Sequence, residues 1–262
     1  MGFELTCGAH FLHIPKTGGE WVEAELIKRG FMKSRYGNRH DDFDRVVYRE
    51  YLSNSGRRHI ILGAKLLASN FTNLLFGIRM HSVLNSKPRT FCFVRHPLRW
   101  FESYWRYNCQ LDWPTWGEGG GERDWHCWAP LNGLGASKFS EFMENVLIKC
   151  PGYLSHLYSS YIDKGVDQVG RTEFLARDFR TILEHLGHKI HENKTTFGPP
   201  KNHSNKKLMV DWTDDLKLRV LQVELAAVQR FAYLDKEEEN LLGIPQNPSM
   251  ICPNLVNLNV RN

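Results

Sequence analysis

A lysine, a threonine and two adjacent glycines lie between an apolar run and a helical pattern near the N-terminus. The segment reads HFLHIPKTGGEWVEAEL, and the four residues are Lys16, Thr17, Gly18 and Gly19. If a strand precedes PKTGG and a helix follows it, backbone N–H groups and the positive helix end favour an anion there. The glycines let the backbone approach closely, Lys16 adds a full charge and Thr17 adds a hydroxyl donor. This composition predicts a phosphate-binding turn.

The order of these residues differs from that of the common nucleotide loop. In G-x-x-x-x-G-K-[ST] the lysine follows the glycines, whereas here Lys16 precedes Gly18. An ordinary ATP or GTP loop is therefore disfavoured. A glycine-containing turn beside a surface lysine can also be purely structural, so this segment alone leaves both interpretations open.

A second group of residues follows the apolar run TFCFVR, residues 90–95. A strand here would carry Arg95 to its carboxyl end, which is the edge where α/β sheets bind ligands. In the helix expected next, Ser103 lies one turn beyond Arg99, so Arg95 and Ser103 could converge on one phosphate. The alternative is an arginine that ends a strand and a serine on a solvated helix face.

Short apolar runs alternate with longer helical patterns along the chain, which predicts an α/β protein with a parallel sheet covered by helices. The strand candidates are residues 10–14, 59–63, 90–95 and 167–171. The helix candidates are residues 17–29, 66–77, 98–108, 138–149, 153–163, 173–187 and 211–231. In the last of these, apolar residues from Leu216 to Phe231 recur at helical spacing after Asp211 and Thr213 as capping candidates.

Residues 108–135 break this alternation, because they are rich in Trp, Gly and charge without periodicity. The segment predicts a long loop or lid within a single domain of residues 1–235, followed by a loosely attached tail, 236–262. The four tryptophans of residues 108–135 could stack against a flat acceptor such as a sugar, or could pack the loop onto the domain. Both interpretations stay open for Trp113, Trp116, Trp125 and Trp128.

Composition limits the function classes. The chain has 262 residues, 42% hydrophobic and 24% charged, which is ordinary for a globular protein. The net charge of +5 suits an anionic ligand, but Lys and Arg are scattered, which argues against nucleic-acid binding. The sequence shows neither a membrane span nor a signal peptide, so we expect a cytoplasmic protein without a membrane partner. Six cysteines without a C-x-x-C pair indicate reduced, mostly buried thiols rather than a zinc site.

Taken together, the two motifs resemble the superfamily of sulfotransferases that use 3′-phosphoadenosine 5′-phosphosulfate (PAPS), in particular its bacterial, phage and carbohydrate-acting branches. In that family a strand followed by a PK-T/S-G segment binds the 5′-phosphosulfate. A later strand ending in R-x-P, with a serine eight positions after the arginine, holds the 3′-phosphate. The segment IPKTGG is similar to the first element, and VRHPLRWFESYW is similar to the second, with Arg95 and Ser103 at the family spacing.

The resemblance covers most of residues 10–234 and implies a three-layer, P-loop-like sulfotransferase fold with helices on both faces of a central parallel sheet. Trp21 falls where many members have a tryptophan near the adenine, and an indole face suits base stacking. VGRTEFLARDFRTILEHLG resembles the family's late strand and helix and includes Arg171. The segment KNHSNKK, residues 201–207, resembles an asparagine-serine segment, and the candidate cofactor contacts in it are Lys201, Asn202, Ser204, Lys206 and Lys207.

The implied reaction is in-line transfer of the sulfuryl group from PAPS to a hydroxyl or amine of a carbohydrate or small molecule, leaving 3′-phosphoadenosine 5′-phosphate (PAP). Lys16 would stabilise the departing phosphate oxygen, while Thr17 and the amides of Gly18 and Gly19 would hold the 5′-phosphate. This arrangement needs no metal. The alternatives are a non-catalytic protein that binds PAP or sulfated glycans and, less favoured, a P-loop kinase.

Two departures from the family pattern concern charge and the general base. Most members have Thr or Ser where this chain has Glu20, and a carboxylate there would repel a phosphate unless it points away or is neutralised by a cation. Many members place a histidine or glutamate base after the second strand, where this chain reads HIILGAKLLASN. Lys65 in this segment lies on the expected reactive edge of the sheet. It could contact the sulfonate or serve as the base. His13, His81 and Glu20 are rival bases, and a structural histidine is the alternative for each His.

Overall fold

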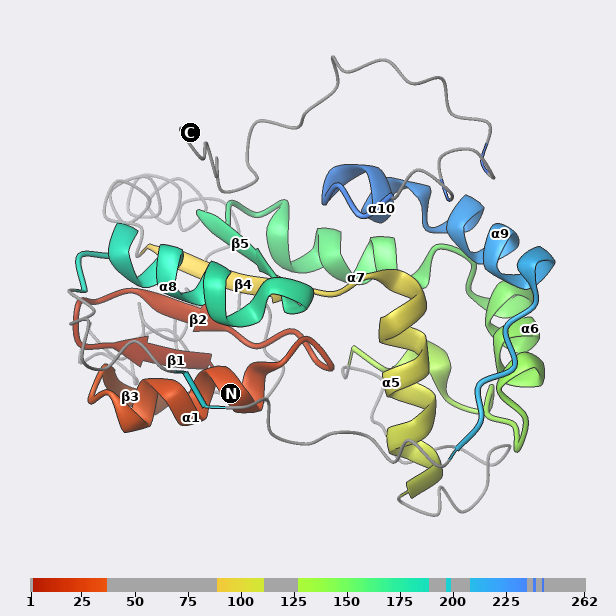
Figure 1. Ribbon diagram of the computed structural model, residues 1–262, viewed down its shortest axis with the longest axis horizontal. Coiled ribbons are helices and arrows are strands. Elements are labelled where there is room, and N and C mark those ends of the chain that lie inside the picture. Colours follow the sequence, from red (N-terminus) through yellow and green to blue (C-terminus); the bar gives the residue numbers. More distant parts are fainter. Residues whose placement is uncertain are drawn as a thin grey trace, which may run out of the picture.

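The structure, a computed structural model, describes residues 2–36, 89–110, 127–188, 197–198 and 208–234, together with residues 238 and 242. Its core is a five-stranded sheet in the order β3-β1-β2-β4-β5 (Figure 1). The strands are β1 (Gly2–Leu5), β2 (His10–Leu12), β3 (Met32–Tyr36), β4 (Thr90–Val94) and β5 (Gln168–Arg171).

The sheet is mixed, which corrects the prediction of a parallel sheet. Strands β2, β4 and β5 are parallel, with Leu12 opposite Cys92 and Val94 opposite Arg171. Strand β1 runs antiparallel to both β2 and β3. The turn between β1 and β2 is short, closed by a 2.8 Å hydrogen bond from the Leu5 N–H to the Ala9 carbonyl. Such a short connection permits only antiparallel pairing.

Seven α-helices lie in the part of the chain that the structure describes. They are α1 (Gly19–Lys28), α5 (Pro97–Gln110), α6 (Phe139–Lys149), α7 (Tyr153–Ile162), α8 (Leu175–His185), α9 (Asp214–Val223) and α10 (Leu225–Arg230). Two 3₁₀ helices, η1 (Ala129–Leu131) and η2 (Thr172–Phe174), precede α6 and α8. The expected elements at 59–63 and 66–77, most of the tryptophan-rich segment and most of the expected tail lie outside the described residues.

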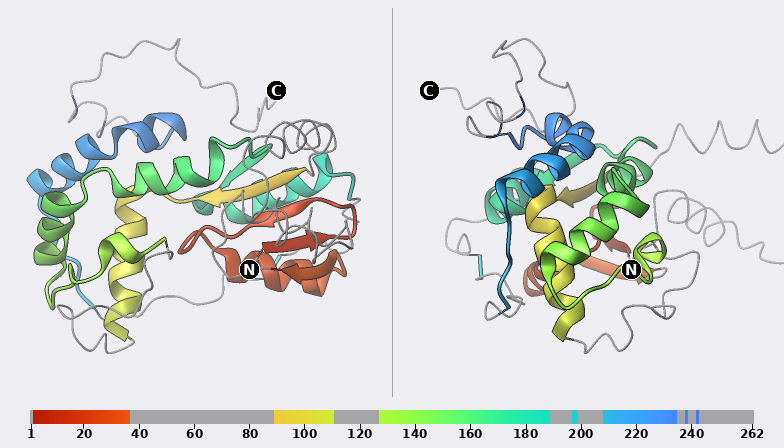
Figure 2. Two further views of the ribbon diagram at one scale, coloured as in Figure 1. Left: turned by 180° about the vertical axis from the view of Figure 1, so that it is seen from behind. Right: turned by 90° about the vertical axis from the view of Figure 1, so that its right-hand side faces the viewer.

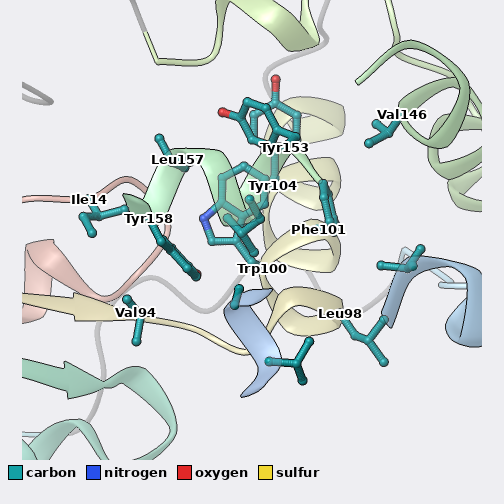
Figure 3. Close-up of a cluster of buried hydrophobic side chains, with 14 of the residues drawn as sticks. Ile14, Val94, Leu98, Trp100, Phe101, Tyr104, Val146, Tyr153, Leu157 and Tyr158 are labelled. Carbon is teal, nitrogen blue, oxygen red and sulfur yellow. The ribbon is translucent and has the colours of Figure 1, made fainter. Parts of the chain in front are cut away.

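Helices cover both faces of the sheet, so the described part of the chain has three layers (Figures 1 and 2). Along β4, Phe91 and Phe93 face a core shared with α1 and α8. Cys92 and Val94 face the opposite core, which also contains residues of α5, α6, α7, α9 and α10. Figure 3 shows how Trp100, Tyr104 and Tyr158 fill this second core beside Val94. This alternation is what a strand buried on both faces requires.

The helix expected over residues 211–231 is interrupted at Glu224, between α9 and α10. The buried Glu224 carboxylate accepts hydrogen bonds from the backbone N–H groups of Leu154 and Ser155, at 2.9 and 2.7 Å. It therefore caps the first turn of α7. Thr213 caps α9 as expected, through a 3.2 Å hydrogen bond from the Leu216 N–H to its hydroxyl.

The other capping candidate acts on a different helix. Asp211 accepts 2.9 and 2.6 Å hydrogen bonds from the backbone and hydroxyl of Ser140, in the first turn of α6. Five cysteines in the described residues are free, but only Cys92 is fully buried, so the expectation of mostly buried thiols was wrong. Among the described helices, none has the length and apolarity needed to cross a membrane.

Candidate functional site

The predicted phosphate-binding turn connects β2 to α1, as expected. Because β2, β4 and β5 are parallel, the turn lies at the same sheet edge as Arg95 and Arg171, which follow and end their strands. Lys16 has a φ of 64° and Gly18 a φ of 85°, so both adopt left-handed backbone conformations within three residues. Glycine tolerates this region easily, whereas lysine does not. Local strain of this kind at a non-glycine residue is often found at functional sites.

Hydrogen bonds from three separate elements hold the turn in place. The indole N–H of Trp100 on α5 donates to the Pro15 carbonyl at 2.9 Å. The Thr17 hydroxyl, completely buried, donates to the Ile14 carbonyl at 2.7 Å. The Thr172 hydroxyl lies 3.0 Å from the Thr17 carbonyl oxygen and 2.9 Å from that of Val94, joining the turn to the end of β4. The surrounding fold thus stabilises the strained conformation.

Arg95 contacts the turn directly. Its guanidinium Nη1 donates to the Lys16 carbonyl oxygen at 3.3 Å. The phenol of Tyr158 on α7 accepts from the Arg95 N–H at 2.9 Å and donates to the Arg95 carbonyl at 2.6 Å. One buried side chain therefore satisfies both backbone groups of Arg95.

The surroundings of Arg95 combine burial with charge. Burial lowers the pKa of Arg95 below its ordinary value, while the nearby carboxylates of Glu173 and Glu102 act in the opposite direction. The guanidinium still carries its charge, because arginine stays protonated in proteins. One nitrogen of the guanidinium donates to the Lys16 carbonyl oxygen, and a guanidinium carries five N–H donors in all. A partly buried cation of this kind at the strand edge is suited to binding an anion.

One face of α5 is turned toward the same loop. Trp100 and Tyr107 lie on this face, since one contacts Pro15 and the ring of the other lies 3.9 Å from the Lys16 ammonium nitrogen. Ser103 is three residues after Trp100 and four before Tyr107, so helical spacing places it between these two contacts. Ser103 is buried. Lys16, Arg95 and Ser103 thus gather at one sheet edge.

The two glycines of the turn are required by close packing. A Cβ at Gly18 would lie 2.9 Å from Cδ2 of Leu175, and a Cβ at Gly19 would lie 2.0 Å from Cδ2 of His13. The His13 ring is buried and stacks against Phe11, with ring centroids 6.0 Å apart. His13 therefore fills the space under the first turn of α1. This packing favours the structural interpretation of His13 over its role as a base.

The side chains of Trp21 and Thr17 both have partners within the protein. Trp21 is 3% exposed, and its indole N–H donates to the Gly198 carbonyl at 2.9 Å. Its ring packs against Phe179 and Phe197, at centroid distances of 5.5 and 5.7 Å, so no open indole face is presented to a base. The Thr17 hydroxyl already donates its proton to Ile14. Both side chains thus stabilise the turn and α1 in this structure, and their direct contacts with cofactor remain predictions.

Arg171 and Glu20 also differ from simple phosphate ligands. The Arg171 guanidinium donates to the Ala232 carbonyl at 3.3 Å and lies 4.6 Å from the Phe174 ring, so it contacts the segment after α10. Glu20 lies in the first turn of α1. A carboxylate there interacts favourably with the positive end of the helix.

Several predicted site residues lie outside the described residues. They are Lys65, His81, Lys201, Asn202, Ser204, Lys206 and Lys207, together with Trp113, Trp116 and Trp125. Trp128 is described, and it is buried against Tyr104 and Tyr107, with centroid distances of 5.1 and 6.0 Å. For this one tryptophan the packing interpretation holds.

Sequence reasoning missed four residues that build the site: Trp100, Tyr107, Tyr158 and Thr172. The first two could have been found, because they share the helical face of Ser103 at spacings of three and four residues. Tyr158 and Thr172 reach the site from α7 and η2, and nothing in their local sequence marks those distant contacts.

The fold and site define an α/β protein with a mixed sheet whose three parallel strands bring Lys16, Arg95 and Arg171 to one edge, beside the helix α5 that carries Ser103. Comparisons with protein-family models, curated proteins and solved structures find no match to this chain. Within the described residues, no group of three or more His, Cys, Asp or Glu side chains is arranged to hold a metal ion.

Proposed function

We propose that the protein is a PAPS-dependent sulfotransferase that moves a sulfuryl group to a hydroxyl or amine of a carbohydrate or small molecule. The observation that carries the proposal is the contact between the two motifs. Arg95 follows β4, Lys16 follows β2, and the Arg95 guanidinium lies 3.3 Å from the Lys16 carbonyl oxygen. Lys16 and Arg95 are 79 positions apart in the sequence. Their meeting at the carboxyl edge is what binding of one bisphosphorylated nucleotide requires.

In this proposal Lys16 stabilises the leaving group. As the bond between the sulfur and the 5′-phosphate oxygen of PAPS breaks, negative charge develops on that departing oxygen, and the Lys16 ammonium interacts with the charge. The acceptor oxygen or nitrogen forms the new bond to sulfur from the opposite side and loses its proton to a base. Little other covalent chemistry falls to the protein, so the geometry of the turn determines the rate.

The 5′-phosphate is assigned to the N-terminus of α1, where the first N–H groups of a helix find no acceptor within the helix itself. Gly18 and Gly19 form this end. The 3′-phosphate is assigned to Arg95 and Ser103. We assign no phosphate contact to the Thr17 hydroxyl and no stacking to Trp21, because both side chains have other partners.

We propose Lys65 as the first candidate for the general base, because the direction of the expected strand 59–63 places it on the reactive edge. His81 is another candidate. Arginine stays protonated and cannot act as a base. If Lys65 only stabilises charge, Lys65→Arg keeps measurable activity and an unmoved pH–rate profile. If Lys65 is the base, the variant loses both turnover and the acidic limb.

Ligand-dependent thermal unfolding and a transfer assay together test the proposal. PAP is expected to raise the unfolding temperature while ATP does not, and labelled PAPS is expected to transfer sulfate to one member of a panel of sugars, phenols, alcohols and amines. Stabilisation by PAP without transfer would favour a non-catalytic binder of PAP. Stabilisation by ATP alone would favour a kinase and contradict the proposal.

A further inference from the structure

The Lys16 ammonium rests on an aromatic ring that comes from a different element of the fold. Its Nζ lies 3.9 Å from the centroid of the Tyr107 ring, near the C-terminal end of α5. A cation at this distance from a tyrosine face is attracted by the negative charge on that face. The attraction acts on the charged ammonium, which is also the form that stabilises a developing phosphate anion.

The Tyr107 ring is itself supported by the tryptophan-rich segment. Trp128 packs edge-on against Tyr107, with centroids 6.0 Å apart and an interplanar angle of 60°. Trp128 is buried and also meets Tyr104 edge-on at 5.1 Å. The neighbouring residue Cys127 is held by a 2.7 Å hydrogen bond from the Tyr153 hydroxyl to its carbonyl oxygen. Contacts therefore run from α7 through Trp128 and Tyr107 to Lys16.

The backbone of Lys16 also restricts the position of its side chain. Its left-handed φ of 64° and the bond from Arg95 to its carbonyl fix the direction in which the side chain leaves the turn. A lysine side chain has several rotatable bonds, and ordering it costs conformational entropy. A ring face that receives the ammonium before ligand binds reduces the ordering needed in the transition state.

We propose that Tyr107, supported by Trp128, is a positioning residue that holds the Lys16 ammonium at the sheet edge. The contact with Lys16 is a property of the free protein. Its effect on rate rests on the proposed function, so the two parts are tested by separate measurements.

The first measurement is NMR of the free protein with ¹³C-labelled lysine, with the Lys16 signal assigned by its loss in Lys16→Arg. The Tyr107 ring is expected to shift the Lys16 ε-methylene protons upfield of those of the exposed Lys28. Tyr107→Phe keeps the ring and should keep the shift, while Tyr107→Leu should abolish it. A Lys16 signal at the Lys28 position in the parent, or one unchanged in Tyr107→Leu, overturns the proposal whatever the activity.

The second measurement is turnover of the same variants with PAPS and one working acceptor. Loss of a cation–π contact predicts a kcat for Tyr107→Leu lower by roughly 2- to 30-fold, with the KM for PAPS changed less than about 2-fold. Tyr107→Phe keeps the ring and should keep the kcat of the parent. If the Tyr107 hydroxyl were the important group, Tyr107→Phe would lower kcat as well. Equal kcat for Tyr107→Leu and the parent overturns the positioning role. Absence of transfer in the parent counts against the proposed function, while the NMR result still decides the contact.

Discussion

The guanidinium of Arg95 donates a 3.3 Å hydrogen bond to the carbonyl oxygen of Lys16, so the arginine of one motif contacts the backbone of the other. Lys16 has a left-handed φ, which directs its carbonyl toward Arg95 while its side chain reaches Tyr107. The two cations are therefore held at one sheet edge by a geometry that involves backbone strain. This relationship links the stability of the turn to its proposed chemistry.

Replacing Arg95 should weaken nucleotide binding. Arg95→Gln removes the charge that we assign to the 3′-phosphate, and a hydrogen bond to a charged group contributes roughly 1.5–3 kcal/mol. Calorimetry should show PAP affinity lower by roughly 10- to 100-fold. The matched control is Arg99→Gln in the first turn of α5, where the side chain is 65% exposed and pairs with Glu102. Equal losses in both variants would mean that general positive charge, and not Arg95, binds the nucleotide.

Replacing Lys16 should separate stability from function. Lys16→Gly and Lys16→Ala both remove the ammonium, but only glycine adopts a φ of 64° without steric cost. Denaturant unfolding should find Lys16→Gly more stable than Lys16→Ala by roughly 1 kcal/mol. Both variants should transfer sulfate far more slowly than the parent while retaining PAP binding. If alanine is as stable as glycine, the turn is not strained at this position.

Replacing Gly19 should expose the packing of His13 under α1. Gly19→Ala places a Cβ 2.0 Å from the buried His13 ring, which must shift. Overpacking of this kind costs roughly 1–3 kcal/mol in the free energy of unfolding. The double variant with His13→Ala should be destabilised by less than the sum of the two single changes, since the clash is gone. Additive effects would show that the ring does not occupy the space beside Gly19.

Stability should depend on pH through the cap that Asp211 provides for α6. Burial raises the pKa of Asp211, but hydrogen bonds from Ser140 outweigh this effect and leave the pKa below its ordinary value of 3.8. A depressed folded pKa means that the stabilisation is present above the unfolded value and is lost as the pH falls through the folded pKa. Asp211→Ala should therefore reduce the free energy of unfolding at pH 7 by roughly 1 kcal/mol. Denaturant unfolding from pH 7 down to about 3 should show the difference between parent and variant shrink at the acid end; a constant difference would contradict the cap.

The sequence predicted the described parallel strands and the helix that follows β4, because their apolar periodicity is strong and local. Residues 90–95 and 98–108 were expected, and β4 (Thr90–Val94) and α5 (Pro97–Gln110) were found. The strand β3 was missed because MKSRY is polar, and its Lys33 and Ser34 contact Glu4 across an edge pairing. The break at Glu224 was missed because its cause is a contact with α7.

The site was predicted in part for the same reason. The positions of Lys16, Gly18, Gly19, Arg95 and Ser103 follow from strand ends and helical spacing, which a sequence reveals. The partners of Trp21 and Thr17 do not, since the Gly198 carbonyl is 177 residues from Trp21 and the hydroxyl of Thr17 turns back to Ile14. Polar side chains near a motif can serve the motif's own scaffold, and only the three-dimensional contacts distinguish this use from ligand binding.

The central claim is that this edge binds a nucleotide through both a 5′-phosphate and a 3′-phosphate, and calorimetric titration of the parent with PAP, AMP and ATP tests it most directly. PAP should bind more tightly than AMP by roughly 10-fold or more, because AMP lacks the phosphate assigned to Arg95. ATP should bind no better than AMP. Equal affinities for PAP and AMP, or tighter binding of ATP than of PAP, would contradict the account.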